Sequence, residues 1–529
     1  MNILENTLSS ARSFAELAFI TVLICVFLQP LQAAGNAEHI VIIAWDGLRP
    51  DMVDATNTPT LNKLARAGTF FSRHHAVYPS STEVNGTTLA TGMYPADSGL
   101  IGNWEYRPKI KPDEPSATES LKTIRRGDEI TGGKYLAVPT IYEMLQAAGC
   151  VTAIAGTKPV ALLPDRSENR SFGAALKSIN VFEGKTLPET LLPKLEETFG
   201  KFPEKPTFPD ASRNRWTLDV LLNSLWKDEA PKLSLLWLSD PDYTQHDSQP
   251  GSAKAIASLK VNDELMARLV GELEVKGIRD KTDILVVSDH GFSTIKQTVD
   301  FAMLLSEAGF RVYRKFFQEP RLGDIMVVGN GGSVFFYVTD HDKETTQRLV
   351  TFLQQCKFCG VIFSLNGLVD TFPLSVAHLN SPDAPDVVVS LRWDNSSNAS
   401  GVKGMIFADA ASNRQTGQGM HNSLSPYDMH NTLIAQGPDF RSGFVDPLPS
   451  GNVDVAPTIL WILAVKPSQR MDGRVLKESL VSAHSPEPKA EETTLTAVSD
   501  QEHWRQYLKI SSVDGTEYFD EGNTEETPK

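Results

Sequence analysis

The chain has 529 residues, of which 41% are hydrophobic and 22% are charged, and its formal net charge is −15. These proportions are ordinary for a globular protein, and the length accommodates one large α/β domain with insertions or two to three domains. The acidic balance argues against a scaffold that binds nucleic acid nonspecifically, because a phosphate backbone requires a basic surface.

The first element is an apolar run over residues 17–28, preceded by Arg12 and followed by a proline and the small residues of LQAAG. This order predicts a signal peptide cleaved near Ala33 or Ala34, which assigns residues 1–34 to it. An uncleaved membrane anchor is the alternative, although the run is short for a full span. We therefore expect a periplasmic or secreted protein, with membrane attachment only if this segment is retained.

Short apolar, β-rich runs then alternate with helical patterns, and most runs end in an acidic or polar residue. The runs are HIVIIAWDG (39–47), VTAIAG (151–156), LSLLWLSDPD (233–242), DILVVSDHG (283–291) and NTLIAQGPD (431–439). Helical spacing is found in residues 58–68, 140–149 and 252–277. The alternation predicts an α/β fold with a mostly parallel central sheet between helices, in which ligands bind beyond the carboxyl ends of the strands.

Two regions have the composition of additions to this sheet. Residues 103–138 are polar and rich in proline, glycine and charge, and residues 294–410 contain their own runs, GSVFFYVTD and TQRLVTFLQQ. We expect both to form cap insertions of one catalytic domain over residues 35–481. Residues 482–529 are predicted to be a linker and a short tail, with a strand pair around Asp514 and Gly515.

The cysteines allow a disulfide without requiring one. Cys25 lies in the apolar N-terminal run, Cys150 stands alone, and Cys356 and Cys359 form the pattern CKFC. In an oxidising compartment this pattern predicts a local disulfide or two free thiols. There is no second such pair to complete a four-thiolate zinc site.

Three acidic residues and three histidines stand mostly at the ends of the predicted strands. They are Asp46, Asp242 and His246 in DPDYTQH, Asp289 and His290 in SDHG, and His421 in GQGMHNS. Each alone has an ordinary explanation, since an aspartate after a strand often caps a helix and a single histidine is uninformative. Together they form a mixed nitrogen and oxygen ligand set, which suits zinc or a similar divalent ion better than calcium or magnesium.

Residues 78–95, YPSSTEVNGTTLATGMYP, are crowded with hydroxyl groups. By itself such a stretch predicts a turn followed by a helix cap. A hydroxyl can also be a nucleophile when a base or a metal activates it, and the free N–H groups of a helix start favour an anionic phosphoryl group. The stretch alone leaves both interpretations open.

The order of Asp46, Thr82, Asp242-x-x-x-His246, Asp289-His290 and His421 resembles the alkaline phosphatase superfamily. More closely, it resembles the type I phosphodiesterase/nucleotide pyrophosphatase family. The segments that carry this resemblance, within about residues 38–475, are VIIAWDGLRPDM, YPSSTEVNGTTLATGMYPADSGLIGN, DPDYTQHD, VVSDHGF and GMHNSLSPYDMHNTLIAQGPDF. It implies an alkaline-phosphatase-like fold and a metal-dependent phosphoric ester hydrolase.

The resemblance also implies the roles of individual residues. Thr82 would be the nucleophile, with Ser81 as the alternative one register position away, and Asn85 would bind a phosphoryl oxygen. One metal ion would be held by Asp242, His246 and His421, and the other by Asp46, Asp289, His290 and the Thr82 oxygen. Two divalent ions, best matched by Zn²⁺ with Mn²⁺ or iron as alternatives, would stabilise the attacking and leaving oxygens.

Several residues bear on the substrate. Lys158 and Asn103 are candidate substrate-binding residues, and Lys158 lies where phosphonoacetate hydrolases of the superfamily carry lysines; a solvated loop lysine is the alternative. Phe70, Phe71 and Trp104 are candidates to line a nucleobase site or to pack in the core. Glu83 and Gly86 depart from the apolar residue and the histidine common in nucleotide pyrophosphatases, which affects the expected nucleotide specificity more than the phosphoryl chemistry.

The sequence therefore predicts a hydrolase that cleaves phosphodiester or phosphoanhydride bonds of small-molecule or nucleotide substrates through a covalent phospho-threonine. A phosphomonoesterase or phosphonate hydrolase of the same superfamily is the first alternative, because the scaffold is shared. A non-catalytic metal-binding relative is the second. A sulfatase is disfavoured, since the hydroxyl-rich stretch lacks the C/S-x-P-x-R motif that this branch carries.

Overall fold

The computed structural model describes residues 35–166, 178–482, 488–499 and 504–525. The predicted signal peptide, residues 1–34, lies outside the described residues. Within the described part of the chain, no helix combines the length and the apolar character that crossing a membrane requires.

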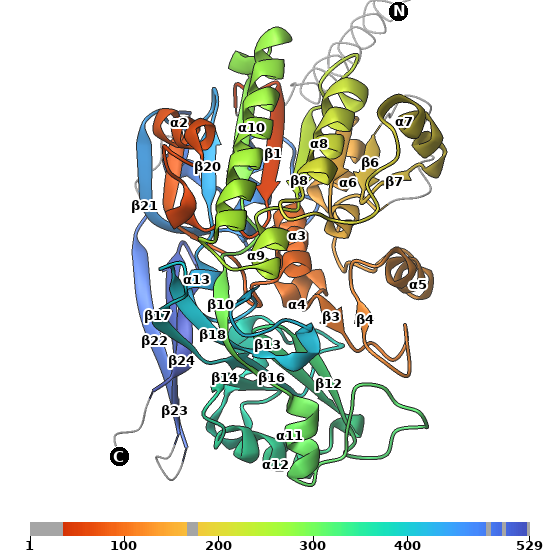
Figure 1. The fold of residues 1–529 in the computed structure, drawn as a ribbon, viewed down its shortest axis with the longest axis vertical. Helices are drawn as coiled ribbons and strands as arrows, with labels where there is room; N and C mark the ends of the chain where they lie inside the picture. The colour runs from red at the N-terminus through yellow and green to blue at the C-terminus, as the bar shows by residue number, and fades with distance from the viewer. Residues whose placement is uncertain (1–34, 167–177, 483–487, 500–503, 526–529) are drawn as a thin grey trace, which may run out of the picture.

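A nine-stranded sheet forms the centre of the upper half of the molecule in Figure 1, in the order β21-β2-β20-β9-β1-β8-β5-β6-β7. The strands are β1 (His39–Trp45), β2 (Thr69–His75), β5 (Thr152–Gly156), β6 (Ile179–Phe182), β7 (Lys185–Leu187), β8 (Leu233–Leu238), β9 (Thr282–Val287), β20 (Leu433–Gln436) and β21 (Phe444–Gly451). β1 is parallel to β8 and β9, and β5 is parallel to β6 and β8, whereas β20 and β7 are antiparallel to their neighbours. All five apolar runs lie in this sheet, which confirms the predicted α/β fold.

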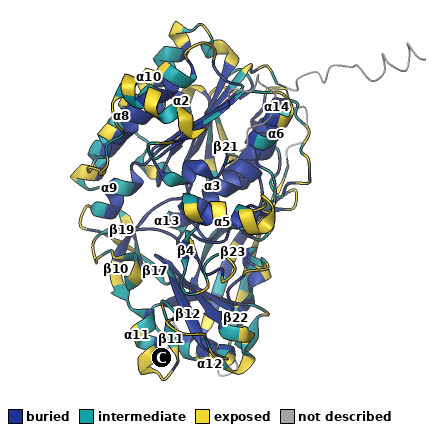
Figure 2. Cartoon of the chain, turned by 90° about the vertical axis from the view of Figure 1, so that its right-hand side faces the viewer, coloured by how far each residue is buried: buried dark blue, intermediate teal, exposed yellow. Residues whose placement is uncertain are grey.

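Helices cover both faces of the sheet because successive side chains of a strand point to opposite sides. Ile42 of β1 packs in the layer that contains α3 (Thr82–Thr91), α6 (Ile141–Ala147) and α14 (Val455–Ile462). Its neighbour Ile43 packs in the layer of α2 (Pro59–Ala67), α8 (Ala211–Val220) and α10 (Ala253–Val275). Figure 2 shows exposed outer surfaces on α8 and α10, while every residue of α3 is buried.

Two smaller sheets occupy the lower half of Figure 1. The six-stranded sheet contains β11 (Val312–Tyr313), β12 (Ile325–Asn330), β13 (Ser333–Val338), β14 (Cys359–Ser364), β15 (Phe372–Pro373) and β16 (Val387–Leu391). The four-stranded sheet contains β10 (Ser293–Val299), β17 (Trp393–Ser397), β18 (Lys403–Asp409) and β19 (Gly419–Met420). The runs GSVFFYVTD and TQRLVTFLQQ correspond to β13 and to α12 (Lys343–Leu353), and α11 (Phe301–Glu307) precedes this sheet.

Residues 103–138 form β3 (Trp104–Glu105), β4 (Ser116–Ala117) and α5 (Leu121–Thr131). β3 and β4 pair with each other in a small separate sheet.

The sequence left open whether Cys356 and Cys359 form a disulfide. In the structure Cys150, Cys356 and Cys359 are free thiols.

The C-terminal part of the chain forms a three-stranded sheet from β22 (Ala490–Val498), β23 (Arg505–Val513) and β24 (Thr516–Thr524). The strand pair around Asp514 and Gly515 is present as β23 and β24. The stretch expected to be a linker, however, contains β22, which pairs with the whole length of β23. The β-branched residues of β22 favour a strand. Most of its side chains are exposed, however, so it lacks the buried face by which a strand is distinguished from a linker in a sequence.

Candidate active site

Three strand ends bring the predicted carboxylates together. Asp46 follows β1, Asp289 follows β9, and Asp242 opens α9 (Asp242–Asp247) just after β8. Since these strands are parallel neighbours, their carboxyl ends meet at one edge of the sheet. Two backbone hydrogen bonds hold these strand ends together. The N–H of Gly47 donates to Oδ1 of Asp289 at 3.0 Å, and the N–H of Asp242 donates to the carbonyl of Asp46 at 3.0 Å.

The three predicted histidines face these carboxylates. His290 Nε2 lies 3.1 Å from Asp289 Oδ2 and 3.7 Å from Asp46 Oδ1. His246 Nε2 and His421 Nε2 lie 3.3 Å and 3.6 Å from the same oxygen, Oδ1 of Asp242.

The Nδ1 atom of each ring contacts a backbone carbonyl at 2.8–3.0 Å; the three carbonyls are those of Gly291, Gly419 and Ser80. A carbonyl can only accept, so Nδ1 carries the proton and Nε2 points at the carboxylates. This is the orientation that metal-ligating histidines adopt.

The cluster has the chemistry of a cation site. Asp46, Asp242 and Asp289 each keep one buried carboxylate oxygen without a hydrogen-bond partner among the described residues. Burial, together with Asp289, raises the pKa of Asp46 well above its usual range. Three carboxylates buried this close together are costly unless cations compensate their charge. Ligand atoms of Asp46, Asp289 and His290 lie within 4.8 Å of one another, as do those of Asp242, His290 and His421. These donors fit divalent ions that prefer mixed nitrogen and oxygen ligands.

Thr82 is the hydroxyl that reaches this cluster. It is the first residue of α3, and its Oγ1 lies 3.1 Å from His290 Nε2. Ser81, the alternative nucleophile, is the N-cap residue; its Oγ is buried without a partner among the described residues and does not line the adjacent cleft. The geometry therefore places Thr82, and not Ser81, beside the ligand set.

Asn85 lies elsewhere than expected. Its Oδ1 accepts a hydrogen bond from the Val77 N–H, and its Nδ2 donates to the carbonyls of Val77, Pro79 and Ser81. The amide therefore holds the turn before α3, and it is not a lining residue of the cleft. A contact between Asn85 and a phosphoryl oxygen does not fit this arrangement.

Asn103, unlike Asn85, lines the cleft that Thr82 also lines. Its Oδ1 accepts a hydrogen bond from the backbone N–H of Glu83 at 3.2 Å. With the oxygen engaged, the amide NH₂ is the group that can donate to a bound anion.

Lys158 is a buried cation at the centre of the site. Its Nζ lies 2.9 Å from Asp46 Oδ2, 3.0 Å from Asp242 Oδ2 and 3.5 Å from Thr82 Oγ1. Although burial favours the neutral amine, the carboxylates of Asp242 and Asp46 raise the pKa of Lys158 well above its usual value. The alternative of a solvated loop lysine is therefore wrong, since this side chain is 8% exposed and ion-paired.

A cleft of about 740 Å³ opens above these residues. Its lining includes Thr82, Lys158, His246 and His421 together with residues of both predicted insertions, among them Asn103, Trp104, Glu119 and Asn330. Of the three aromatic candidates, only Trp104 lines the cleft. Phe71 is buried in one core layer and Phe70 packs against the other.

Two polar partners were not anticipated from the sequence. Trp237 of β8 donates its indole N–H to Asp46 Oδ2 at 2.7 Å, and pairing of β8 with β1 is the signal that could have indicated it. Glu119 lines the cleft with Glu83; each keeps a buried oxygen without a hydrogen-bond partner among the described residues, and burial raises both pKa values. Residues 103–138 contain no periodic pattern that could have indicated Glu119.

Gly86 is explained by packing. A Cβ atom at this position would lie 2.7 Å from Val160 Cγ2 and 3.1 Å from the indole ring of Trp237. A larger residue would have to displace Val160 and would crowd Trp237, whose indole N–H donates to Asp46.

The central sheet between helices is an alkaline-phosphatase-like fold, with three aspartates and three histidines gathered at the ends of its strands. The sequence profile described as type I phosphodiesterase / nucleotide pyrophosphatase matches residues 40–422, and this chain belongs to that family.

Relatives and solved structures agree with this assignment. A venom phosphodiesterase of Naja atra is 24% identical over 286 residues, 51% of this chain and 29% of the relative. Ectonucleotide pyrophosphatase/phosphodiesterase family member 1 of Homo sapiens is 23% identical over 256 residues, 47% of this chain and 23% of the relative. The match thus spans under a third of these curated relatives. Murine ectonucleotide pyrophosphatase/phosphodiesterase 5 shares the fold, with a TM-score of 0.57 at 15% identity over 84% of this chain and 100% of that chain.

Proposed function

We propose that this chain is a metal-dependent hydrolase that cleaves phosphodiester or phosphoanhydride bonds of small-molecule or nucleotide substrates. The observation that carries the proposal is the position of Thr82 Oγ1, 3.1 Å from His290 and open to the cleft beside two groups of buried ligands. Membership of the type I phosphodiesterase / nucleotide pyrophosphatase family supports it. A murine relative of the same fold is described in complex with AMP, which supports a nucleotide-sized substrate.

Two divalent ions, with Zn²⁺ as the first choice, belong to this proposal. One would be held by Asp242, His246 and His421, and the other by Asp46, Asp289, His290 and Thr82 Oγ1. When bound, such ions supply positive charge that stabilises the oxygens of an in-line displacement at phosphorus.

The protein's own groups divide the remaining work. Thr82 Oγ1 loses its proton to solvent and attacks phosphorus, and a P–O bond forms while the bond to the leaving-group oxygen breaks and that oxygen takes up a proton. Water then attacks the phosphorus of the phospho-threonine, the phosphoryl group leaves as the product, and the Thr82 oxygen regains a proton. The NH₂ of Asn103 and the N–H groups of Thr82 and Val84 at the start of α3 hold the non-bridging oxygens, while the Glu83 N–H donates to Asn103 Oδ1 and orients that amide. The ammonium of Lys158 offsets the charge of these oxygens.

A periplasmic or secreted location belongs to the same proposal. The predicted signal peptide supports it, and so do the names of the relatives, which include venom phosphodiesterases and ectonucleotide pyrophosphatases.

The test compares hydrolysis of bis-p-nitrophenyl phosphate and of p-nitrophenyl phosphate by the purified, zinc-loaded chain, with Thr82→Ala as the control. A diester preference that disappears in the variant supports the proposal. A monoester preference that disappears in the variant replaces it with the second candidate below. No hydrolysis of either compound by a chain with bound zinc contradicts both.

A phosphomonoesterase or phosphonate hydrolase is the second candidate, and Lys158 is the observation that favours it. A monoester or phosphonate dianion carries one more negative charge on its terminal oxygens than a diester does. A buried ammonium 3.5 Å from the nucleophilic oxygen is placed to offset that charge.

The two asparagines give a direct test of how the phosphoryl oxygens are bound. We expect Asn103→Ala to lower kcat/KM by about 10²-fold, since it removes one positioned donor, without changing the zinc content. Asn85→Ala should instead lower the free energy of unfolding by about 1–3 kcal/mol, because buried backbone groups of the preceding turn lose their partners. Steady-state kinetics and thermal unfolding of both variants check this. Loss of activity at unchanged stability in Asn85→Ala, with a fully active Asn103→Ala, would return the phosphoryl contact to Asn85.

A further inference from the structure

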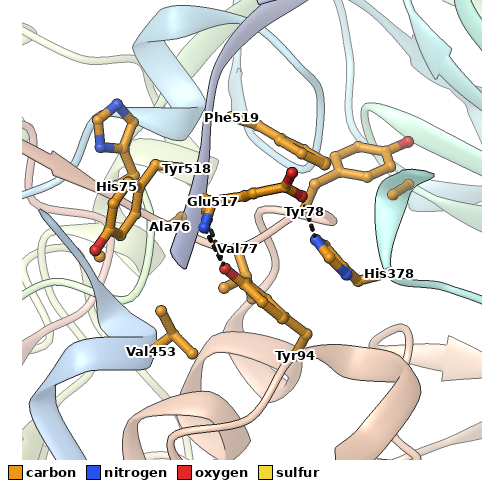
Figure 3. Close-up of a pocket in the computed structure, with 12 residues that line it drawn as sticks. His75, Ala76, Val77, Tyr78, Tyr94, His378, Val453, Glu517, Tyr518 and Phe519 are labelled. Carbon is orange, nitrogen blue, oxygen red and sulfur yellow. Dashed lines mark hydrogen bonds and ion pairs between the residues drawn. The ribbon is translucent and has the colours of Figure 1, made fainter. Parts of the chain in front are cut away.

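A second group of possible metal ligands lies away from the cleft, where the C-terminal sheet meets the central sheet. His75 ends β2, His430 directly follows α13 (Pro426–Met429), and Asp520 lies on β24. One ligand atom from each of the three lies within 4.8 Å of the others. Figure 3 shows His75 at this junction beside Tyr518 of β24, and the two rings stack at 5.7 Å.

The ring of His75 is oriented by its surroundings. Its Nδ1 lies 3.0 Å from the carbonyl oxygen of Ser450, and its Nε2 lies 3.1 Å from Oδ1 of Asp520. The carbonyl requires the proton on Nδ1, so a neutral His75 presents the Nε2 lone pair to a carboxylate oxygen. Two acceptors at this distance need a cation between them, and that cation is either a proton or a metal ion.

The position of His430 favours a metal ion over a proton at this site. Its ring lies against that of His75, with 4.3 Å between the centroids, and the two residues form an isolated β-bridge. One ring nitrogen of His430 lies within 4.8 Å of the ligand atoms of His75 and Asp520, so this imidazole is placed to share a cation with them. A proton would join only His75 and Asp520, whereas a divalent ion would use all three groups.

The charges around Asp520 are compatible with a cation. The hydroxyl of Ser511 donates to Oδ2 of Asp520 at 2.7 Å, which leaves Oδ1 for the site. Arg73 approaches Oδ1 only to 3.5 Å, while it lies 2.9 Å from Glu492 and 2.8 Å from Ser511. Its charge is therefore balanced mainly by Glu492, and it does not occupy the position of an ion.

We propose that His75, His430 and Asp520 bind a third divalent ion of the zinc class, with water completing its coordination, and that this ion fastens the C-terminal sheet to the central sheet. Two imidazole nitrogens and one carboxylate oxygen are a zinc-type ligand set. The ligands come from positions as far as 445 residues apart, so binding is coupled to the folded arrangement. The ion lies outside the cleft and takes no part in the proposed hydrolysis.

The first experiment compares zinc content between matched variants of the full chain, stripped with a chelator, reloaded with Zn²⁺ and desalted. Asp520→Asn and His430→Gln are each expected to hold one zinc ion fewer per chain than the wild type, with activity on p-nitrophenyl substrates within about twofold. Asp514→Asn is the control, since it makes the same charge change at the exposed turn of the same hairpin and should keep the wild-type zinc content. His430→Gln leaves the His75–Asp520 contact in place, so it separates metal loss from the loss of that ion pair. Wild-type zinc content in both folded variants would overturn the proposal.

A second measurement remains decisive if those variants fail to fold. In a full chain that carries Asp242→Asn and Asp289→Asn, the active-site ligands are weakened, and two buried carboxylates become neutral amides. We expect this chain to bind one equivalent of Co²⁺ with the visible absorption of a low-coordinate site, and to unfold at a higher temperature with Co²⁺ than without it. A chain that binds no Co²⁺ rejects the third site, whatever the outcome of the hydrolysis assays.

Discussion

Replacing Thr82 by alanine is expected to lower kcat on the preferred nitrophenyl substrate by at least about 10³-fold, since the variant lacks the oxygen that would form the covalent intermediate. The metal ion proposed to lie beside Thr82 keeps three of its four proposed ligands, namely Asp46, Asp289 and His290. The variant should therefore bind zinc and fold normally. Turnover measured alongside zinc content and thermal unfolding checks both parts of this expectation.

Ser81→Ala is the matched control for the nucleophile. The Ser81 hydroxyl is buried without a hydrogen-bond partner among the described residues, so its removal should change kcat less than threefold. Thr82→Ser keeps a primary hydroxyl at the same place and should retain part of the activity. If Ser81→Ala is inactive and Thr82→Ala is active, the nucleophile lies one residue earlier. If both alanine variants turn over normally, no hydroxyl of this turn forms the intermediate.

The grouping of the proposed ligands could be predicted from the sequence because it depends on strand geometry. Asp46 and Asp289 each follow an uninterrupted apolar run, and parallel runs deliver their ends to one edge of a sheet. The family resemblance then assigned each histidine to one of the two proposed metal ions. Neither argument needs a side-chain conformation, and the structure brings the aspartates and the histidines together.

Asn85 could not be placed in the same way, because its position depends on the direction of one side chain. On a helix, side chains point back toward the N-terminus, so a residue in the first turn covers the segment before the helix. Asn85 therefore binds the carbonyls of Val77 and Pro79 and not a ligand beyond the helix start. Asn103 lies 20 residues after Glu83, in an insertion without periodicity, and its proximity is a tertiary contact.

The same limit applies to the C-terminal sheet. The composition of β22 is polar and its side chains are mostly exposed, so neither periodicity nor hydrophobicity distinguishes it from a linker. Only its pairing with β23 makes it a strand. The contact between His75 and Asp520 likewise depends on how this sheet packs against β2, for which the sequence contains no local signal.

Replacing Lys158 distinguishes a phosphodiesterase from a phosphomonoesterase, and we expect it to have the second large effect on activity. Lys158→Met should lower kcat/KM for p-nitrophenyl phosphate by about 10³-fold and that for bis-p-nitrophenyl phosphate by only about 10-fold. The ammonium lies 3.5 Å from Thr82 Oγ1, and a monoester dianion presents one more charge to it than a diester. Parallel kinetics on the two substrates, with zinc content measured in each preparation, provide the comparison.

Lys111→Met is the matched control, because Lys111 lines the same cleft but is partly exposed and paired with Glu114 at 2.6 Å. It should change neither rate more than threefold. An equal loss on both substrates in Lys158→Met would mean that the ammonium acts by holding Asp46 and Asp242 and not on the phosphoryl group. Glu83 and Glu119 face the same cleft, but burial raises their pKa values, which favours the neutral carboxyl groups, and they supply no positive charge there. A dianionic substrate therefore depends on Lys158 more than a diester does, and the ratio of the two losses measures that dependence.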